Sequence, residues 1–370
     1  MKITLSLTHR CNLSCRYCYS GRAVKKDMLF ATAQRIVDFA VNITPPGQRI
    51  EVCFFGGEPL LRFDLIKQIT TYIREQEKET SPVYLSITTN GTLLTQPILD
   101  FLRKERIDLC ISIDGPKHVH DRNRCYKNGR GSFSKVVKNL SKAAEQINSV
   151  QVNAVYGPET VNFLPETVSF FTQLGIPAIH LNPNICALWT ESTYANLQKI
   201  YMQIANHYIQ SYRDGKGIAI NLIDSKIILF LKRGYTTEDL CGMGETEWGF
   251  APSGNIYPCE RFIGEDDDSS LCLGNIHTGL DVARRCSLLK QRGNHNEECK
   301  TCDFKKYCMN WCGCTNYHMT GHTDQVGPML CASEKAALQA AEHVFITLSQ
   351  CNNELFVDHL MQHLCERGGI

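Results

Sequence analysis

The chain has 370 residues, of which 43% are hydrophobic and 21% charged, and its formal net charge is +1. These proportions are those of an ordinary globular protein, and such a charge gives no field that would favour nucleic acid or an acidic membrane surface as a partner. No apolar run reaches the length of a membrane span, and the N-terminus enters a predicted strand directly, so we expect a cytoplasmic protein without a signal peptide or a membrane anchor.

Strand-like and helix-like segments alternate over the first half of the chain. The predicted strands are Ile3–Leu7, Ile50–Phe55, Val83–Thr88, Leu109–Ile113, Val150–Val155 and Ala178–Leu181. The predicted helices between them are Phe30–Val41, Phe63–Gln76, Ile98–Lys104, Phe133–Ile147 and Phe163–Leu174. This order calls for a parallel sheet with right-handed crossovers, and six strands are too few to close an eight-stranded barrel. We therefore expect an α/β fold, a partial (β/α)6 TIM-like barrel whose site lies at the C-terminal ends of the strands.

The second half of the sequence is less regular. Two helices, Tyr194–Tyr212 and Asp224–Leu231, are expected first. From Gly242 onward the chain is rich in glycine and cysteine, so it buries little apolar surface and metal is expected to hold it together. In this segment Asp266-Asp267-Asp268 predicts a solvated loop, and a helix is expected from Cys331 towards Leu348. The predicted domains are residues 1–190, the barrel; 191–235, a helical bridge; 236–335, the cysteine-rich domain; and 336–370, a C-terminal helix.

The nineteen cysteines are concentrated near the N-terminus and after residue 240. A disulfide framework is not expected in the cytosol, where thiols stay reduced, so this distribution indicates metal ligation at two places. Cys11, Cys15 and Cys18 follow the first strand with the spacing C-x3-C-x2-C, and the next cysteine, Cys53, lies on a separate predicted strand. A zinc site would want a fourth ligand close by, whereas three ligands to a [4Fe-4S] cluster leave one iron open. The alternative is a surface loop whose cysteines bind nothing.

This spacing, with Tyr17 before the last cysteine, resembles the signature of the radical S-adenosylmethionine (SAM) enzymes. The resemblance implies that the open iron binds SAM. An electron donor such as flavodoxin or ferredoxin would then drive the cleavage of SAM to a 5′-deoxyadenosyl radical, which abstracts hydrogen from the substrate.

Three further strand ends resemble the SAM-binding parts of the same family. The stretch Gly56-Gly57-Glu58-Pro59 resembles the motif that binds the amino group of SAM, and the ends of the third and fourth strands resemble those that meet its ribose and carboxylate. Arg124 is the candidate partner of the carboxylate, with a surface ion pair as the alternative. The candidate SAM-binding residues are Gly56, Gly57, Glu58, Pro59, Thr89, Asn90, Ser112, Asp114 and Arg124.

The C-terminal cysteines also carry a resemblance. Taken alone, the run C-x2-C-x5-C-x3-C that begins at Cys299 is compatible with a zinc ribbon. With the cysteines before and after it, the run resembles the SPASM extension of radical SAM enzymes, which houses two auxiliary [4Fe-4S] clusters. The resemblance implies three clusters in all. The implied ligands are Cys241, Cys259 and Cys312 for the first auxiliary cluster, and Cys299, Cys302, Cys308 and Cys331 for the second.

One departure concerns the first auxiliary cluster. Sulfatase-maturating members have a further cysteine soon after the position of Cys241, and residues 242–248 here contain none. The fourth iron would then be open to substrate, or take Cys272, Cys314 or a carboxylate. Glu260 occupies the place of an acidic residue that is thought to act as a base in those enzymes, with a purely structural role as the alternative.

The resemblance implies an enzyme that modifies a ribosomally made peptide, with a thioether or carbon–carbon crosslink as the product. One alternative is an enzyme that oxidises Cys or Ser of a sulfatase, a protein substrate, to formylglycine. Another is a non-enzymatic iron–sulfur or zinc protein, against which the SAM-type strand ends count. Because the chain starts at its first strand, leader recognition would need a separate leader-binding protein or another surface.

Overall fold

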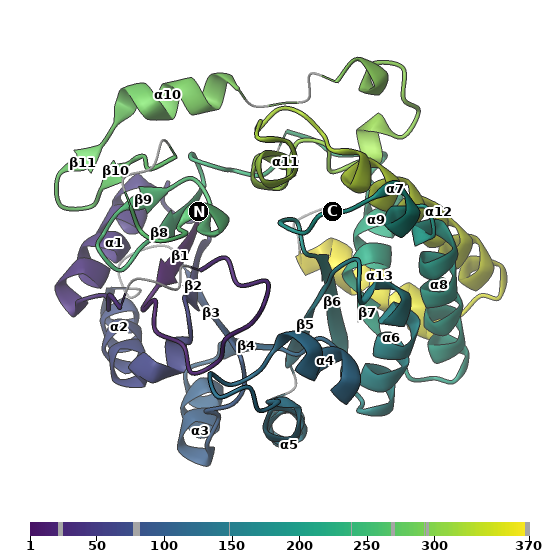
Figure 1. Cartoon of the computed structure of the whole chain (residues 1–370), viewed down its shortest axis with the longest axis horizontal. Helices are drawn as coiled ribbons and strands as arrows, with labels where there is room; N and C mark the ends of the chain where they lie inside the picture. Colours follow the sequence, from purple (N-terminus) through teal and green to yellow (C-terminus); the bar gives the residue numbers. More distant parts are fainter. Residues whose placement is uncertain are drawn as a thin grey trace. The chain divides into compact units, whose positions relative to one another are not determined.

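The computed structural model describes residues 1–20, 25–76, 82–147, 149–237, 239–267, 271–291, 293 and 296–366 (Figure 1). The chain forms two compact units. The first consists of Met1–Ser112, Asp121–Ser149 and Cys241–Arg292, and the second of Ile113–His120, Val150–Leu240 and Gly293–Ile370.

The first unit is built on a sheet with the strand order β4-β3-β2-β1-β8-β9. Its strands are β1 (Lys2–Ser6), β2 (Ile50–Phe55), β3 (Val83–Thr89), β4 (Ile107–Ser112), β8 (Glu247–Phe250) and β9 (Ile256–Tyr257). The strands β1 to β4 and β8 are parallel, and β9 is antiparallel to β8. A separate antiparallel pair joins β10 (Gly274–Asn275) and β11 (Gly279–Leu280). The C-terminal segment of this unit therefore extends the sheet that the N-terminus begins.

Helices cover the outer face of this sheet, as Figure 1 shows for α1, α2, α3 and α5. The helical elements are α1 (Phe30–Ile43), η1 (Pro59–Arg62), α2 (Phe63–Gln76), α3 (Gln96–Lys104), α5 (Phe133–Ala144), η4 (Glu260–Phe262) and α10 (Val282–Lys290). The helix α4 (Lys117–Asn123) lies where the two units meet in sequence. Ile3 and Leu5 of β1 are fully buried, and because side chains alternate along a strand, Thr4 and Ser6 occupy the opposite face.

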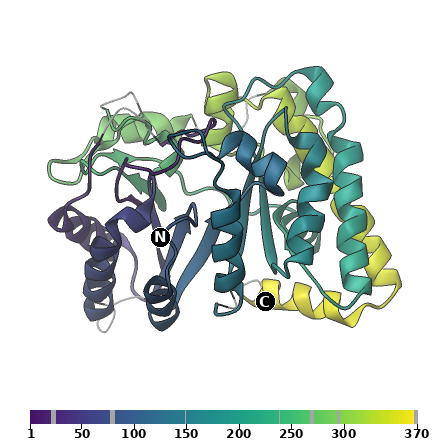
Figure 2. The same cartoon turned by 60° about the horizontal axis from the view of Figure 1, so that its bottom comes forward.

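The second unit has a parallel sheet, β5-β6-β7, and a layer of helices. Its strands are β5 (Gln151–Tyr156), β6 (Ala178–Pro183) and β7 (Ala219–Ile220). Its helical elements are η3 (Val161–Phe163), α6 (Leu164–Gln173), α7 (Glu191–Tyr194), α8 (Leu197–Arg213), α9 (Asn221–Leu231), η5 (Glu297–Cys299), η6 (Lys305–Tyr307), α11 (Gly313–Thr320), α12 (Pro328–Gln350) and α13 (Glu354–Glu366). A hydrogen bond of 2.9 Å between the Tyr201 and Ser333 hydroxyls joins α8 to α12. Figure 2 shows the teal helices of this unit beside the yellow C-terminal α13.

The predicted strands and helices are confirmed to within three residues at each end. The strand β8 and the helices α4, α7, α10 and α11 are among the elements that were not predicted, and the C-terminal helix expected over 336–370 is divided between α12 and α13. The helices that the structure describes include none that is both long and apolar enough to cross a membrane.

The prediction of a solvated loop at Asp266 is wrong. Its side chain is fully buried and accepts hydrogen bonds from the backbone N–H of Ser253 at 3.1 Å and from Asn255 Nδ2 at 3.0 Å. Its Oδ2 also lies 3.7 Å from Nε2 of the buried His9. Asp267 is exposed as predicted, and Asp268 lies outside the described residues. The carboxylate of Asp266 is therefore buried, and it connects the C-terminal segment of the first unit to the residues that follow β1.

Candidate functional site

The turn after β2 lies directly on the cysteine loop, residues 8–18, that follows β1. The backbone N–H of Gly57 donates to the Thr8 carbonyl at 2.7 Å, and the N–H of Glu58 donates to the Arg10 carbonyl at 2.9 Å. A Cβ at Gly56 would lie 2.5 Å from the Thr8 carbonyl oxygen, and one at Gly57 would lie 2.4 Å from that of Arg10. The two glycines are therefore required for the close packing of this turn on the loop.

The side chain of Glu58 links the ends of β2 and β3 within the first unit by hydrogen bonds. Its carboxylate is fully buried and accepts hydrogen bonds from Thr89 Oγ1 at 2.7 Å, the Asn90 N–H at 2.8 Å and the Leu60 N–H at 3.0 Å. Burial raises the pKa of Glu58 above its ordinary value, although these hydrogen bonds and the charge of Arg124 oppose the shift. The three predicted SAM-site residues Glu58, Thr89 and Asn90 are thus joined in one network.

The same network reaches the first cysteine. Asn90 Nδ2 donates to Asn12 Oδ1 at 2.9 Å and lies 3.7 Å from Cys11 Sγ. The backbone N–H of Leu13 also points to this sulfur, at 3.4 Å. The position of Cys11 is therefore set by the ends of β1 and β3 together.

The three N-terminal thiols fit a shared, positively charged metal group. Burial raises the pKa of Cys11 to about 11, and the nearby charges of Glu58, Cys15 and Cys18 act in the same direction. Thiolates that repel one another in a partly buried loop are stabilised when they bind a metal centre. Among the described residues these thiols do not meet within the 4.8 Å span of a single-ion site. Ligands to separate irons of one cubane need no such convergence.

Arg124 lies against the cysteine loop and is only 7% exposed, so the alternative of a surface ion pair is wrong. Its Nη1 is 4.0 Å from Cys15 Sγ, and its guanidinium carbon lies 5.3 Å from the centre of the Tyr17 ring. The Ser132 hydroxyl donates to the Arg124 carbonyl at 2.7 Å and fixes its backbone. A buried cation therefore borders the three cysteines.

The remaining predicted SAM residues are Pro59, Ser112 and Asp114. Pro59 opens η1 directly after Glu58, and Ser112 is buried at the end of β4. Asp114 belongs to the second unit, where its Oδ1 accepts the backbone N–H of Val155 at 3.2 Å. The structure thus gives Asp114 a partner in β5, and its contact with SAM stays a prediction.

Two C-terminal cysteines of the first unit lie beside carboxylates. Cys241 Sγ is 3.4 Å from Glu247 Oε2, and Cys259 Sγ is 3.2 Å from Glu260 Oε2. Donor atoms of Glu247, Cys259 and Glu260 lie within 4.8 Å of one another, and within the described ranges they form the one such group of three. Sequence reasoning missed Glu247, although it stands in the stretch that lacks the expected cysteine.

Glu260, the predicted base, is ionised at neutral pH. Burial by itself would raise its pKa, but the charges of Lys2 and Arg261 and the hydrogen bond with Cys259 hold the pKa below its ordinary value. A deprotonated carboxylate beside a thiol is suited to accept a proton, and it is equally suited to a structural ion pair.

The other two thiols considered for the first auxiliary cluster have different surroundings. Cys272 is buried, and its Sγ contacts the Gly274 carbonyl oxygen at 3.3 Å. In the second unit, Cys314 Sγ lies 3.5 Å from Cys312 Sγ, which is also 3.2 Å from Thr315 Oγ1. Neither Cys272 nor Cys314 belongs to the group of converging donors.

The predicted ligands of the second auxiliary cluster, Cys299, Cys302, Cys308 and Cys331, all belong to the second unit. Burial raises the pKa of Cys331, the charge of Lys335 opposes this, and the thiols of Cys299 and Cys302 add to it. Burial and the charge of Glu334 raise the pKa of Cys308, and the thiol of Cys331 adds to this. Joint ligation of one cluster by these four thiols stays a prediction.

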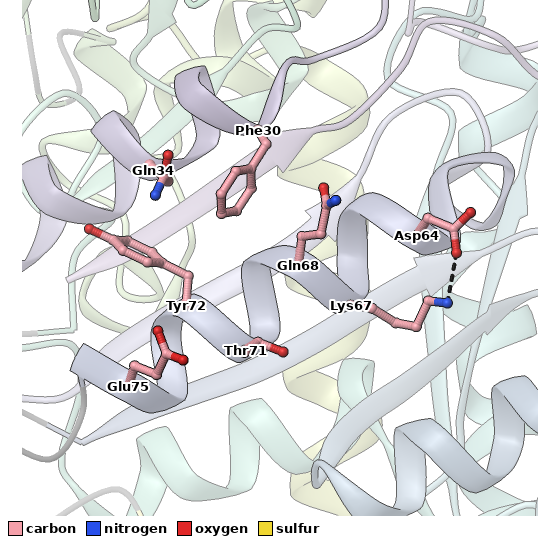
Figure 3. A pocket seen from close by; sticks show the side chains of 8 residues that line it. All are labelled: Phe30, Gln34, Asp64, Lys67, Gln68, Thr71, Tyr72 and Glu75. Atoms are coloured by element: carbon pink, nitrogen blue, oxygen red, sulfur yellow. Dashed lines mark ion pairs between the residues drawn. The ribbon is translucent and has the colours of Figure 1, made fainter.

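A further hollow lies between α1 and α2, on the helical face of the first unit (Figure 3). Its lining residues are Phe30, Gln34, Asp64, Lys67, Gln68, Thr71, Tyr72 and Glu75. Asp64 pairs with Lys67 at 2.7 Å, and the Tyr72 hydroxyl donates to Asp38 at 2.6 Å. None of the candidate site residues lines this hollow, so it is separate from the cysteine loop.

Comparison with known proteins gives a family and several relatives. The radical SAM superfamily model matches residues 5–171. An uncharacterized protein of Methanocaldococcus jannaschii is 33% identical over 177 residues. The matched region is 48% of this chain and 60% of that protein's length. The cysteine-type anaerobic sulfatase-maturating enzyme of Clostridium novyi is 23% identical over 82% of this chain and 84% of its own. The radical SAM cyclopropyl synthase TigE of Paramaledivibacter caminithermalis is 23% identical over 84% of this chain and 67% of its own.

A solved structure shares the fold. The structure of native anSMEcpe with bound AdoMet and Cp18Cys peptide has a TM-score of 0.80 at 19% identity and covers 95% of this chain and 99% of that one. The predicted fold class, α/β with a partial (β/α)6 barrel followed by a cysteine-rich C-terminal region, is thereby confirmed.

Proposed function

The chain is a member of the radical SAM superfamily, and from this premise we propose that it cleaves SAM reductively in order to oxidise a peptide or protein substrate. The observation that carries the proposal is the junction of three strand ends in the first unit. There the cysteine loop, the Gly56–Pro59 turn and the end of β3 are joined by hydrogen bonds through Glu58 and Asn90.

In this proposal Cys11, Cys15 and Cys18 would hold a [4Fe-4S] cluster, and its open iron would take up SAM. The backbone of the Gly56–Pro59 turn faces the amino group, and Arg124 pairs with the carboxylate, because its buried guanidinium borders Cys15. Thr89, Asn90 and Ser112 of the first unit complete the binding surface. The cluster, when bound, supplies the electron that SAM cleavage requires.

The overall step balances as a two-electron oxidation of the substrate. One electron from a low-potential donor, such as a flavodoxin or ferredoxin, breaks the carbon–sulfur bond of SAM and gives methionine and a 5′-deoxyadenosyl radical. The radical takes one hydrogen atom from the substrate and becomes 5′-deoxyadenosine. The substrate radical then loses one electron, which the auxiliary clusters held by the C-terminal cysteines would accept, and one proton, which goes to a base as the new bond forms. We assign the base to Glu260, whose lowered pKa keeps it deprotonated.

The substrate class we favour is a ribosomally made peptide that receives a thioether or carbon–carbon crosslink. Support comes from the radical SAM cyclopropyl synthase among the relatives and from the peptide bound to anSMEcpe. The lack of a cysteine in residues 242–248 favours this product over formylglycine. Maturation of a sulfatase is the second candidate, favoured by the sulfatase-maturating relatives and by Glu260 at the position of their acidic residue. A separate leader-binding protein would be a further partner.

The test uses anaerobically reconstituted protein with SAM and dithionite, and it measures 5′-deoxyadenosine together with iron. We expect about twelve irons per chain, from three clusters of four irons, and SAM cleavage above that of a Cys11/Cys15/Cys18→Ala variant. Peptides from neighbouring reading frames are then added and analysed by mass spectrometry. Loss of two hydrogens from a peptide supports a crosslink, and an aldehyde in a sulfatase peptide supports the second candidate. No SAM cleavage above the variant would overturn the proposal.

A further inference from the structure

We propose that Glu247 supplies a carboxylate ligand to the first auxiliary cluster, in the stretch where the sulfatase-maturating enzymes have an additional cysteine. This inference rests on the proposed function, because it takes Cys241 and Cys259 as ligands of that cluster. The cluster is then closed by the protein itself in the resting enzyme, and no substrate thiolate is needed to complete it.

The sheet fixes the position of Glu247. It is the first residue of β8, and the parallel pairing of β8 with β1 places it opposite Lys2. Its Oε1 accepts a hydrogen bond from Lys2 Nζ at 2.7 Å, while its Oε2 lies 3.4 Å from Cys241 Sγ. One carboxylate oxygen is thus held by a cation and the other is directed at a thiol. Such an arrangement of a ligating oxygen with an outer partner is typical of metal-binding carboxylates.

The second cysteine reaches the same place from another segment. Cys259 is only 4% exposed and follows β9, which is antiparallel to β8. A Cβ at Gly249 would lie 2.8 Å from the Glu260 Cα, so the glycine lets the turn at Cys259 pack directly on β8. Donor atoms of Glu247, Cys259 and Glu260 consequently fall within 4.8 Å of one another. A buried thiol and two half-buried carboxylates that converge in this way favour a bound metal, because their negative charges repel one another when the thiol is ionised.

Glu247 fits the ligand role better than the other candidates. It contacts the thiol of Cys241 and lies within 4.8 Å of that of Cys259, whereas the contact of Glu260 is with Cys259. Cys272 directs its Sγ to the Gly274 carbonyl oxygen and stands outside the converging group. Iron accepts carboxylate oxygen as well as thiolate sulfur, and the change of ligand alters the reduction potential of the cluster.

The experiment isolates the auxiliary clusters in the full chain with Cys11, Cys15 and Cys18 all replaced by Ala. Into this background we introduce Glu247→Gln, Glu247→Cys, Glu260→Gln and the matched control Glu245→Gln, whose side chain is exposed two residues away. The readouts are iron and zinc per chain, Mössbauer and electron paramagnetic resonance spectra, and the reduction midpoint.

We expect Glu247→Gln to change the spectrum and the midpoint of one of the two auxiliary clusters and to release at most the iron that Glu247 holds, since the cysteines still bind the other irons. Glu247→Cys should keep the full iron content with a changed spectrum and a shifted midpoint, which also shows that the chain still folds. Glu245→Gln and Glu260→Gln should keep the iron content of the triple-alanine parent. The inference is overturned if Glu247→Gln and Glu247→Cys both retain the parent spectrum and midpoint, or if zinc rather than iron depends on Glu247.

Measurements on the chain with its N-terminal cysteines intact separate this inference from the proposed function. If that chain cleaves SAM while its auxiliary spectrum is insensitive to Glu247, only the inference fails. If the auxiliary spectrum depends on Glu247 but SAM is never cleaved, the ligand assignment stands and the proposed function fails.

Discussion

The cysteine loop after β1 and the cysteine segment 299–312 carry similar predicted ligands, yet different structural features position them. In the loop, backbone hydrogen bonds run to the end of β2, as at Gly57 and Thr8, so the sheet of the first unit sets the ligand positions. In the segment, the chain forms the short elements η5 and η6, and hydrogen bonds from a side chain, rather than from a sheet, fix the backbone. Asn310 Nδ2 donates to the carbonyls of Lys305 and Cys308, both at 3.0 Å. A sheet can order metal ligands before the metal arrives, whereas isolated turns depend on side chains and on the metal itself.

A buried ion pair is the second support of the C-terminal segment. Glu334 in α12 accepts hydrogen bonds from Lys226 Nζ at 2.6 Å and from the Met309 N–H at 2.5 Å. Lys226 Nζ also lies 3.4 Å from the Tyr307 carbonyl oxygen. The backbone on both sides of Cys308 is therefore tied to charged groups on α9 and α12.

The largest effect should come from the N-terminal ligands. Replacing Cys11, Cys15 and Cys18 together by Ala should abolish SAM cleavage, because no described residue offers a substitute set of thiols there. The auxiliary iron should remain, since its ligands lie elsewhere in the chain. Cys351→Ser, which changes an exposed thiol far from ligand spacing, is the control. Residual formation of 5′-deoxyadenosine in the triple variant would contradict the assignment.

Removal of iron by a chelator should separate the two regions. Amide hydrogen exchange should rise strongly over residues 297–312, which have little regular structure to protect them. Amides of β1 to β4 should stay protected, because the parallel ladder does not depend on metal. Equal loss of protection in the strands and in the segment would show that the comparison is wrong.

Glu334→Ala should destabilise the second unit by about 3–5 kcal/mol, the typical cost of leaving one partner of a buried ion pair uncompensated. Urea unfolding of the iron-loaded protein provides the measurement. Glu342→Ala removes an exposed carboxylate from the same helix and should change stability by much less. If the Glu334 variant is as stable as the Glu342 variant, the ion pair does not stabilise the segment.

Glu58→Ala should lower SAM affinity roughly ten- to a hundredfold, from the loss of about 1.5–3 kcal/mol of charge-assisted hydrogen bonding. The carboxylate is occupied by Thr89, Asn90 and Leu60, so the effect would act through the position of the turn. Equilibrium binding of SAM and iron content are measured together, with exposed Glu75→Ala as the control. If SAM affinity and iron content are both unchanged, the role of Glu58 is structural only.

The smallest effect concerns acid stability. Burial would raise the pKa of Asp266, but contacts with His9, Ser253 and Lys26 outweigh burial and hold it below its ordinary value of 3.8. The ionised form is therefore favoured by folding. This contribution is fully present above pH 3.8 and is lost as the pH falls through the lower pKa of the folded state.

Asp266→Asn should then lower the stability of the first unit by about 1 kcal/mol at neutral pH and flatten the acid limb of its stability curve. Asp267→Asn changes an exposed carboxylate next to it and should leave the curve unchanged. If the stability of both variants depends on pH in the same way in the acid range, the pKa of the buried carboxylate is not changed by folding.

The strands and helices of the barrel were predictable because their apolar residues recur with clear periods over five to fourteen residues. The strand β8 has only four residues, Glu-Trp-Gly-Phe, too few for alternation to be visible. Its partner β1 also lies far away in sequence, so local patterns cannot reveal the pairing. The cysteine ligand sets stay predictions from their spacing. Glu247 was not among the predicted ligands, because its position depends on the register of β8 with Lys2 in β1. Asp266 was predicted to be solvated because composition does not show which carboxylate of an acidic run turns inward.

The pairing of β8 with β1 also has a consequence for biosynthesis. Lys2 and Glu247 are 245 positions apart, so this edge of β1 has no partner until most of the chain has left the ribosome. An unpaired edge of an apolar strand is a template for association with other chains. Nascent chains that stop short of Glu247 should therefore be caught by chaperones or aggregate, and ribosome-bound chains of increasing length should become resistant to protease only after β8 has emerged.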